Sequence, residues 1–158
     1  MNIVFVCTSN TCRSPVAELF AVEWFRRRLQ LSREEQERRG IKIQSAALTD
    51  AFEKPGSPAS ENAVRVLREY QLDLSHHRSQ LLTEQMCATA DYVVCLASGH
   101  AYKVVELFPA IKERSGALCV LPRDVPDPWH MPYDTYMENA AQVEELVREF
   151  LDKNITWD

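Results

Sequence analysis

Short apolar segments alternate along the chain with longer segments in which the apolar positions recur every three or four residues. The short segments predict β-strands at residues 2–7, 41–45, 92–96 and 117–121. Residues 92–96 are almost continuously apolar, which is typical of a parallel strand buried on both faces. The sequence therefore predicts a sheet with at least one fully buried strand.

The segments with helical periodicity predict helices at residues 14–29, 58–71, 83–89, 100–108 and 135–153. Ser14-Pro15 and Ser57-Pro58 each favour a helix start, because Ser is a good N-cap and Pro suits the first helical position. Residues 32–39 are highly charged and begin with the spacing of a capping box, so they predict a short solvated helix or a loop insertion.

Strands that alternate with helices are typical of parallel sheets joined by right-handed crossovers. The whole chain, residues 1–158, is predicted to form a single α/β domain. We expect a flavodoxin-like three-layer sandwich with a four-stranded parallel sheet of order 2-1-3-4, flanked by helices. The loop after the first strand would then lie at the switch point of the sheet, where such folds bind their ligands.

Composition narrows the possible classes of protein. A chain of 158 residues with 46% hydrophobic residues is an ordinary globular domain. The early apolar run at residues 3–6 is too short for an export signal, so the five cysteines are expected to be reduced thiols in the cytoplasm. The net charge of −5 disfavours nucleic acid as a partner, and no membrane partner is expected.

The candidate chemistry lies between the first strand and the first helix. Cys7 ends the strand, and Arg13 directly precedes the Ser14-Pro15 pair. A loop that leads into a helix N-terminus brings several backbone N–H groups into one small space, which suits a tetrahedral oxyanion. Arg13 would add a bidentate fork, and the same field would favour Cys7 as a thiolate nucleophile.

These residues resemble a known family. Cys7 and Arg13 in the spacing Cys-x5-Arg-Ser-Pro after a strand, together with Asn10 and a distant Asp127-Pro128, resemble the low-molecular-weight protein tyrosine phosphatases, which include protein-arginine phosphatases. The alternative reading is a buried structural Cys7 with Arg13 on a solvated helix face. The motif is a hypothesis that its structural context must test.

The resemblance implies a protein phosphatase that forms a phosphocysteine intermediate on Cys7, with Arg13 clamping the phosphate. It places the general acid at Asp127, with Asp124 as the competing carboxylate. It also implies phosphorylated proteins as substrates, inorganic phosphate as product, and neither a cofactor nor a metal. The predicted phosphate-binding loop comprises Thr8, Ser9, Asn10, Thr11, Cys12 and Ser14.

Residues around this loop are expected to support it. By resemblance, Ser45 and His76 would brace Asn10, for which a tight loop can require a positive φ. Trp129 and Tyr133 would form aromatic walls at the substrate mouth, or else pack within their own loop. Ser14 is close enough in sequence to donate a hydrogen bond to the Cys7 sulfur, and by resemblance Cys12 could form a protective disulfide with Cys7, which would make the enzyme redox-regulated.

The substrate is less firmly indicated than the chemistry. Members selective for phosphotyrosine tend to carry Ile where this chain has Thr11, whereas phosphoarginine phosphatases carry Thr, so Thr11 slightly favours phosphoarginine. One alternative is a thioredoxin-coupled arsenate reductase, which would need Cys87 and Cys95 as relay thiols. Another is a catalytically silent module that binds phosphoproteins.

Overall fold

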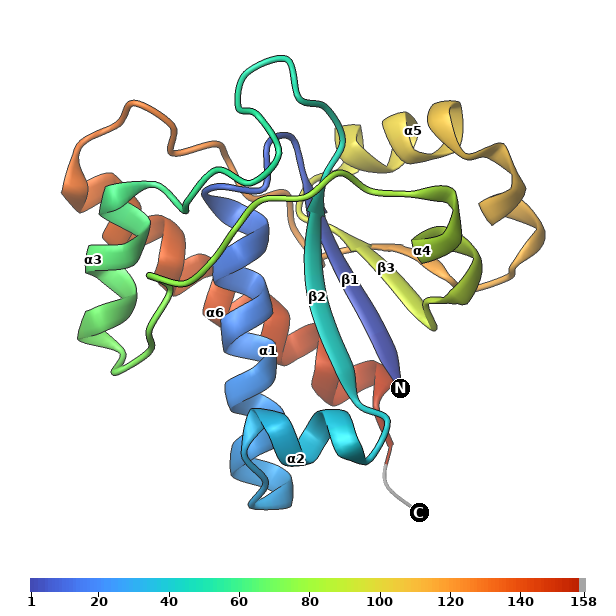
Figure 1. Cartoon of the computed structure of the whole chain (residues 1–158), viewed down its shortest axis with the longest axis horizontal. Coiled ribbons are helices and arrows are strands. Elements are labelled where there is room, and N and C mark those ends of the chain that lie inside the picture. The colour runs from blue at the N-terminus through green and yellow to red at the C-terminus, as the bar shows by residue number, and fades with distance from the viewer. Residues whose placement is uncertain (157–158) are drawn as a thin grey trace.

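The computed structural model describes residues 1–156, which form one α/β unit around a four-stranded sheet. All strand pairs are parallel, and the order β2-β1-β3-β4 confirms the predicted 2-1-3-4 topology (Figure 1). The strands are β1 (Asn2–Cys7), β2 (Lys42–Ala47), β3 (Tyr92–Cys95) and β4 (Leu118–Val120). The central position of β1 brings the loop that follows it between the carboxyl ends of its two neighbours.

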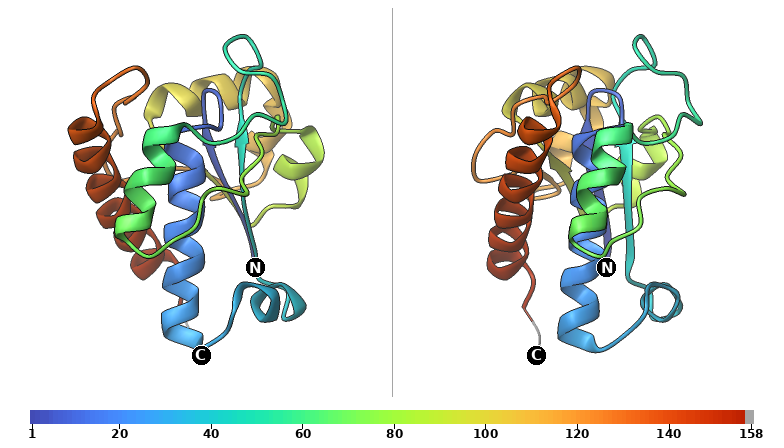
Figure 2. Two further views of the ribbon diagram at one scale, coloured as in Figure 1. Left: turned by 60° about the vertical axis from the view of Figure 1, so that its left-hand side comes forward. Right: turned by 90° about the vertical axis from the view of Figure 1, so that its left-hand side faces the viewer.

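Helices cover both faces of the sheet and complete three layers, as the two further views show (Figure 2). The side chains of β1 alternate between the two faces, as in any strand. Ile3 and Phe5 pack with α1, α3 and α6, whereas Val4 and Val6 face α4, α5 and a 3₁₀ helix. The helices are α1 (Arg13–Leu29), α2 (Arg33–Arg38), α3 (Glu61–Glu69), α4 (Glu84–Thr89), α5 (Ser98–Leu107), the 3₁₀ helix (Pro109–Glu113) and α6 (Tyr133–Asn154).

Helix α1 begins one residue earlier than predicted, and this changes the role of Ser14. Cys12 occupies the N-cap position, and Arg13 is the first helical residue. Ser14 is therefore inside the first turn and does not cap the helix. Its hydroxyl is instead free to contact the Cys7 sulfur.

The predicted helix start at Ser57-Pro58 is wrong. Helix α3 begins only at Glu61, after Ser60. Ser57 lies in an extended segment in which its backbone N–H and C=O pair with Ser79. This pairing uses the backbone groups that a helix would require, so the local cap-and-proline signal is overridden.

The charged segment at residues 32–39 does form a short helix. Ser32 and Glu35 make the predicted reciprocal capping box at the start of α2. The buried Gln36 side chain donates hydrogen bonds to the carbonyls of Val22 and Leu31, which attach α2 to the end of α1. The segment is thus an ordered addition to the fold.

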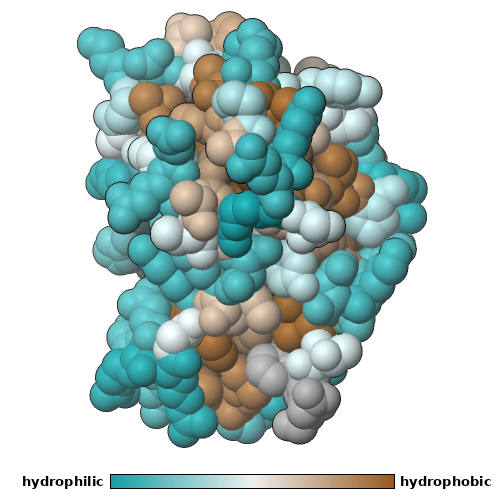
Figure 3. Space-filling model, turned by 90° about the vertical axis from the view of Figure 1, so that its right-hand side faces the viewer, coloured by the Kyte–Doolittle hydropathy of each residue, from teal (hydrophilic) through white to brown (hydrophobic). Residues whose placement is uncertain are grey.

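The surface on the side of α4 and α5 shows separate apolar patches among hydrophilic side chains (Figure 3). Among residues 1–156, no helix combines the length and the apolar character that crossing a bilayer requires.

Candidate active site

The loop between β1 and α1 leaves a set of backbone donors without acceptors. None of the N–H groups of residues 8–13 donates a hydrogen bond to any acceptor within the described residues 1–156. The first N–H groups of a helix always lack intrahelical partners, and here the preceding loop adds more of them. Together they form a potential anion site at the positive end of the α1 dipole.

Cys7 lies at the base of this loop. Its side chain is buried, and its Sγ lies 2.9 Å from the Ser14 hydroxyl and accepts a 3.4 Å hydrogen bond from the Ser14 backbone N–H. The contact expected between Ser14 and Cys7 is therefore present. Both donors would stabilise a thiolate at this position.

Arg13 is buried beside Cys7 although it carries a full charge. Its Nη1 donates to the carbonyl of Val125 at 3.0 Å, and its Nη2 lies 3.7 Å from Asp127 Oδ2. The Asp127 side chain is 49% exposed, and its Oδ1 accepts the backbone N–H of Trp129. The proline-rich loop thus brings a carboxylate to the mouth of the anion site, as the sequence predicts.

Asp124, the competing carboxylate, has another structural role. It accepts hydrogen bonds from both the hydroxyl and the backbone N–H of Ser98, at 2.8 and 2.9 Å, at the start of α5. These hydrogen bonds lower the pKa of Asp124 below its ordinary value. Among the residues described, it does not line the pocket that contains Cys7.

The site opens into a pocket of about 260 Å³. Two aromatic rings form one wall, with the centroids of Phe52 and Trp129 5.9 Å apart. Phe52 was not predicted, although it is the one aromatic residue of a polar loop that follows β2 at the same edge of the sheet. The lining residues are Cys7, Thr8, Ser9, Thr11, Cys12, Arg13, Phe52, Asp127 and Trp129.

Tyr133 does not belong to this set of described lining residues, contrary to the expected aromatic wall. It is the first residue of α6, where the guanidinium of Arg65 from α3 stacks over its ring at 4.3 Å from the centroid. The ring instead packs against the main core. The aromatic wall of the substrate pocket is therefore formed by Trp129 and Phe52, and not by Trp129 and Tyr133.

Asn10 holds the loop in shape from within. It is fully buried with φ +60°, and its Nδ2 donates to the hydroxyls of Ser14 and Ser45 at 2.9 and 2.8 Å. Its Oδ1 accepts the backbone N–H of Gln80. The side-chain amide thus replaces the backbone hydrogen bonds that the loop lacks, and it includes the expected contact with Ser45.

The histidine that braces this loop is His77 and not His76. His77 Nε2 lies 2.7 Å from the Asn10 carbonyl oxygen, which can only accept, so Nε2 carries the proton and donates. Burial lowers the pKa of His77, in keeping with a neutral ring. The side chain of His76 is 90% exposed and lies 3.5 Å from Asp73. Only one of two adjacent side chains can face the loop, and the sequence pattern did not distinguish them.

His100 is a further residue that the sequence did not indicate. It lies in the first turn of α5, and its Nε2 is 3.3 Å from Thr8 Oγ1. The ring is buried, and burial, reinforced by the Arg13 charge, lowers the pKa of His100 to about 4. Its position after β3 at the carboxyl edge of the sheet was the only available signal.

The lowered pKa of His100 predicts a loss of stability in acid. In the unfolded chain His100 is protonated below pH 6.5, whereas in the folded chain it is protonated only below about pH 4. The free energy of unfolding therefore falls as the pH falls through this window. Between pH 7.5 and 4.5 the wild type should lose about 2 to 3 kcal/mol more unfolding free energy than His100→Gln. Urea unfolding at both pH values tests this, with the exposed His76→Gln as control. An equal loss in the wild type and His100→Gln would contradict the prediction.

The remaining thiols differ from Cys7 in their surroundings. Cys12 lies 3.4 Å from both the Ser60 and Tyr136 hydroxyls, and burial raises its pKa. Burial also raises the pKa of Cys87 to about 11 and that of Cys95 to about 12. Across residues 1–156, no group of three or more His, Cys, Asp or Glu side chains is arranged to hold a metal ion.

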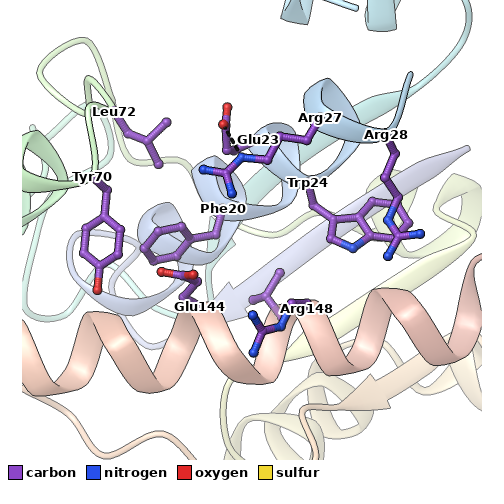
Figure 4. A pocket seen from close by; sticks show the side chains of 10 residues that line it. Phe20, Glu23, Trp24, Arg27, Arg28, Tyr70, Leu72, Glu144 and Arg148 are labelled. Carbon is purple, nitrogen blue, oxygen red and sulfur yellow. Dashed lines mark hydrogen bonds and ion pairs between the residues drawn. The ribbon is translucent and has the colours of Figure 1, made fainter. Parts of the chain in front are cut away.

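A second pocket, of about 240 Å³, lies between α1 and α6, away from Cys7 (Figure 4). Its walls include Phe20, Trp24 and Tyr70, and charged side chains such as Arg148 and Glu144 stand at its rim. It contains none of the loop residues 8–13, so it is separate from the candidate chemistry around Cys7.

Comparison with known proteins identifies the family of this chain. The family model for "Low molecular weight phosphotyrosine protein phosphatase" matches residues 2–158. A protein-arginine-phosphatase from Geobacillus stearothermophilus is 32% identical over 156 residues, covering 96% of this chain and 95% of the relative. The low molecular weight protein-tyrosine-phosphatase Wzb of Escherichia coli is 27% identical over 154 residues, covering 94% and 92%.

Solved structures extend the similarity to the fold. A mutant of YwlE from Bacillus subtilis superimposes with a TM-score of 0.79 at 29% identity, covering 97% of each chain. The YwlE arginine phosphatase from Geobacillus stearothermophilus gives a TM-score of 0.77 at 31% identity, covering 96% of this chain and 90% of that one. The chain therefore belongs to the low molecular weight phosphotyrosine protein phosphatase family and is a cysteine-dependent protein phosphatase.

Proposed function

We propose that the enzyme hydrolyses phosphorylated protein side chains through a phosphocysteine on Cys7. The observation that carries this proposal is the set of unpaired N–H groups of residues 8–13 around a buried thiol, with Arg13 and Asp127 at the same pocket. In the first step the Cys7 sulfur attacks phosphorus while the bond from phosphorus to the side-chain atom breaks. The loop amides and Arg13 stabilise the charge on the three non-reacting oxygens.

Asp127 supplies the proton that the departing side-chain atom needs. In the second step the ionised Asp127 takes a proton from water, whose oxygen attacks phosphorus and displaces the Cys7 thiolate. Ser14, at 2.9 Å from the sulfur, stabilises this thiolate as leaving group as well as nucleophile. Inorganic phosphate is the product. The solved structure of a YwlE arginine phosphatase in which serine replaces cysteine has a phosphorylated active site serine, which supports a covalent intermediate of this kind.

We favour phosphoarginine as the substrate. Thr11 lines the pocket and is buried, and its hydroxyl contacts only the Cys12 sulfur, at the long distance of 3.9 Å, within the described chain. A hydroxyl there can pair with a polar guanidinium, whereas an aromatic ring would leave it without a partner. Phosphotyrosine is the second candidate, because the exposed edges of Phe52 and Trp129 form a wall against which a phenyl ring can pack.

Replacing Thr11 tests this choice. Thr11→Ile removes the hydroxyl and adds apolar bulk, and we expect it to reduce phosphoarginine turnover far more than phosphotyrosine turnover. The ratio of the two kcat/KM values should shift at least about tenfold, equivalent to about 1.4 kcal/mol in relative barrier. The measurement is a side-by-side assay on the two phosphopeptides.

Thr89→Ile, on α4 and remote from the pocket, serves as the matched control for this substitution. A ratio that stays within a factor of two of the wild type in Thr11→Ile would show that Thr11 is not the selector. The phosphotyrosine assignment would then be preferred. Arsenate with thioredoxin forms a third arm of the assay, and turnover there would favour a reductase.

The contacts of the other thiols argue against the reductase alternative. A thiol relay needs exposed cysteines with lowered pKa values. Burial instead raises the pKa of Cys87 and Cys95, and Cys95 lies inside β3. A silent binding module would need Arg13 but neither Cys7 nor Asp127 in its pocket.

We also propose that Cys12 protects Cys7 during oxidation. Both thiols line the same pocket, where burial raises the pKa of Cys12 and a negative charge on Cys7 raises it further. A sulfenic acid formed on Cys7 can condense with the Cys12 thiol to a disulfide, with loss of water. A reduced thiol pair of this kind fits a cytoplasmic enzyme.

A further inference from the structure

The hydrogen bonds around Asn10 continue beyond Ser45 to a residue of the charged insertion. Ser45 donates its hydroxyl hydrogen to Glu18 Oε2 at 2.6 Å, and Glu18 Oε1 accepts from Arg33 Nη2 at 2.6 Å. The same Arg33 nitrogen also donates to the carbonyl of Ile43 in β2 at 3.1 Å. A continuous chain of contacts therefore runs from α2 to the loop that surrounds Cys7.

Each hydrogen in this chain has a direction fixed by the group before it. Ser45 donates its single hydrogen to the Glu18 carboxylate, which accepts it at Oε2. The lone pairs of Ser45 are then left to accept from Asn10 Nδ2, while the Gln80 N–H that donates to Oδ1 fixes the orientation of the amide. The second hydrogen of Nδ2 goes to Ser14 Oγ.

The chain ends at the sulfur. Because Ser14 already accepts from Asn10, its own hydrogen is available to be donated to Cys7 Sγ, 2.9 Å away. This is the direction that stabilises a thiolate. An amide at position 18 could donate to Ser45 instead, which would release the Ser45 hydrogen towards Asn10 Nδ2, itself a donor, and weaken the contacts that hold Asn10 in place.

Arg33 is placed to pair with the Glu18 carboxylate at 2.6 Å. The side chain of Glu18 is only 12% exposed, and burial penalises an unpaired carboxylate. Arg33 is the first residue of α2, and the Ser32–Glu35 capping box holds this end of the helix. Helix α2, which lies outside the active site, thus supplies the counter-ion of Glu18.

We propose that Arg33 and Glu18 are positioning residues that fix the hydrogen-bond direction around Cys7 and so hold it in its reactive form. This proposal rests on the proposed function, in which Cys7 is the nucleophile. It gives the 32–39 segment a part in catalysis without any contact with substrate.

Other charges face these groups and must be counted in any pH profile. Arg13, Asp127 and Cys12 line the pocket with Cys7, and His100 contacts Thr8 of the same loop. His77 interacts with both Glu18 and Arg33.

Glu37 Oε1 lies 3.6 Å from Arg33 Nε on the outer side of α2. The variants below leave all of these neighbouring residues unchanged, so a difference from the wild type reports the Arg33–Glu18 pair.

The test is the pH dependence of Cys7 alkylation by iodoacetamide, followed by mass spectrometry of the peptide that contains Cys7. Alkylation reports the thiolate without requiring turnover. In Arg33→Met and in Glu18→Gln the pH midpoint of alkylation should rise by about one unit, because the donor from Ser14 is no longer directed at the sulfur. Arg38→Met, on the same short helix, should leave the midpoint within about 0.2 of a unit of the wild type.

The proposal also requires that the effects of replacing Arg33 and Glu18 are not additive. The double variant Arg33→Met/Glu18→Gln should shift the midpoint no more than Glu18→Gln alone, because residues in one network are not additive. Arg33→Lys keeps a cation beside Glu18 and should restore at least half of the shift. An unchanged midpoint in Glu18→Gln, or shifts that simply add in the double variant, would overturn the proposal.

Two further readouts separate the possible failures. Thermal unfolding followed by circular dichroism establishes that each variant is folded, and if Arg33→Met is not, Arg33→Lys compared with Glu18→Gln decides the question. If alkylated Cys7 leaves phosphatase activity intact, the proposed function fails, whatever the midpoints are. If alkylation abolishes activity but the midpoints do not move, only the positioning role fails.

Discussion

Cys7→Ser is expected to reduce turnover by several powers of ten while the protein still binds oxyanions. The hydroxyl of serine is a far weaker nucleophile and a far poorer leaving group than a thiolate, so turnover through a covalent intermediate is slowed severely. The loop amides and Arg13 do not depend on the sulfur, so the anion site should survive. Steady-state assays on a phosphoarginine peptide measure the first effect, and calorimetric binding of inorganic phosphate measures the second.

Cys119→Ser is the matched control, because Cys119 is a partly exposed thiol of β4 that does not line the pocket. It should behave as the wild type in both measurements. Activity above about one per cent in Cys7→Ser would exclude Cys7 as the nucleophile, given the size of the loss that removal of covalent catalysis should cause. Loss of phosphate binding in the same variant would mean that the sulfur is needed to shape the loop.

Asp127→Asn should lose about 10²–10⁴-fold in kcat on tyrosine phosphate, whose oxygen is a poor leaving group without a proton. The loss should shrink on an activated aryl phosphate when phosphoenzyme hydrolysis does not limit the rate. This pattern follows because Asn keeps the size of the side chain and the hydrogen bond to the Trp129 N–H but cannot transfer a proton.

Asp124→Asn provides a close comparison, since it removes a carboxylate only three residues earlier in the same loop. Asp124 is bound to the start of α5, so its replacement should affect that helix and leave the leaving-group dependence unchanged. A larger loss in Asp124→Asn than in Asp127→Asn would show that the general acid has been assigned to the wrong carboxylate.

The fold was largely predictable because the strands are short, apolar and separated by helical periodicity. Every strand was expected within a few residues, and the sheet order is the one expected of a flavodoxin-like fold. The helix starts were less predictable. Ser57-Pro58 has the local chemistry of a helix start, but pairing with Ser79, a residue far along the chain, decides its conformation.

The residues of the site also differ in how far the sequence alone could predict them. Residues 7–14 are contiguous, so their proximity could be inferred from the sequence. His77, Phe52 and His100 reach the site from three separate loops and turns, and nothing local distinguishes them from neighbours such as His76. Their positions depend on how the carboxyl ends of the strands gather, which is a tertiary property.

The unpaired amides of residues 8–13 also determine how hydrogen exchange should be read in this enzyme. The amides of β1 are secured by β2 and β3 on both sides, whereas those of the adjoining loop have no acceptor within residues 1–156. Exchange of the loop amides with deuterium is therefore governed by whether an oxyanion occupies the site, and exchange of β1 by the stability of the sheet. Two neighbouring stretches of one peptide thus report separately on ligand occupancy and on global unfolding.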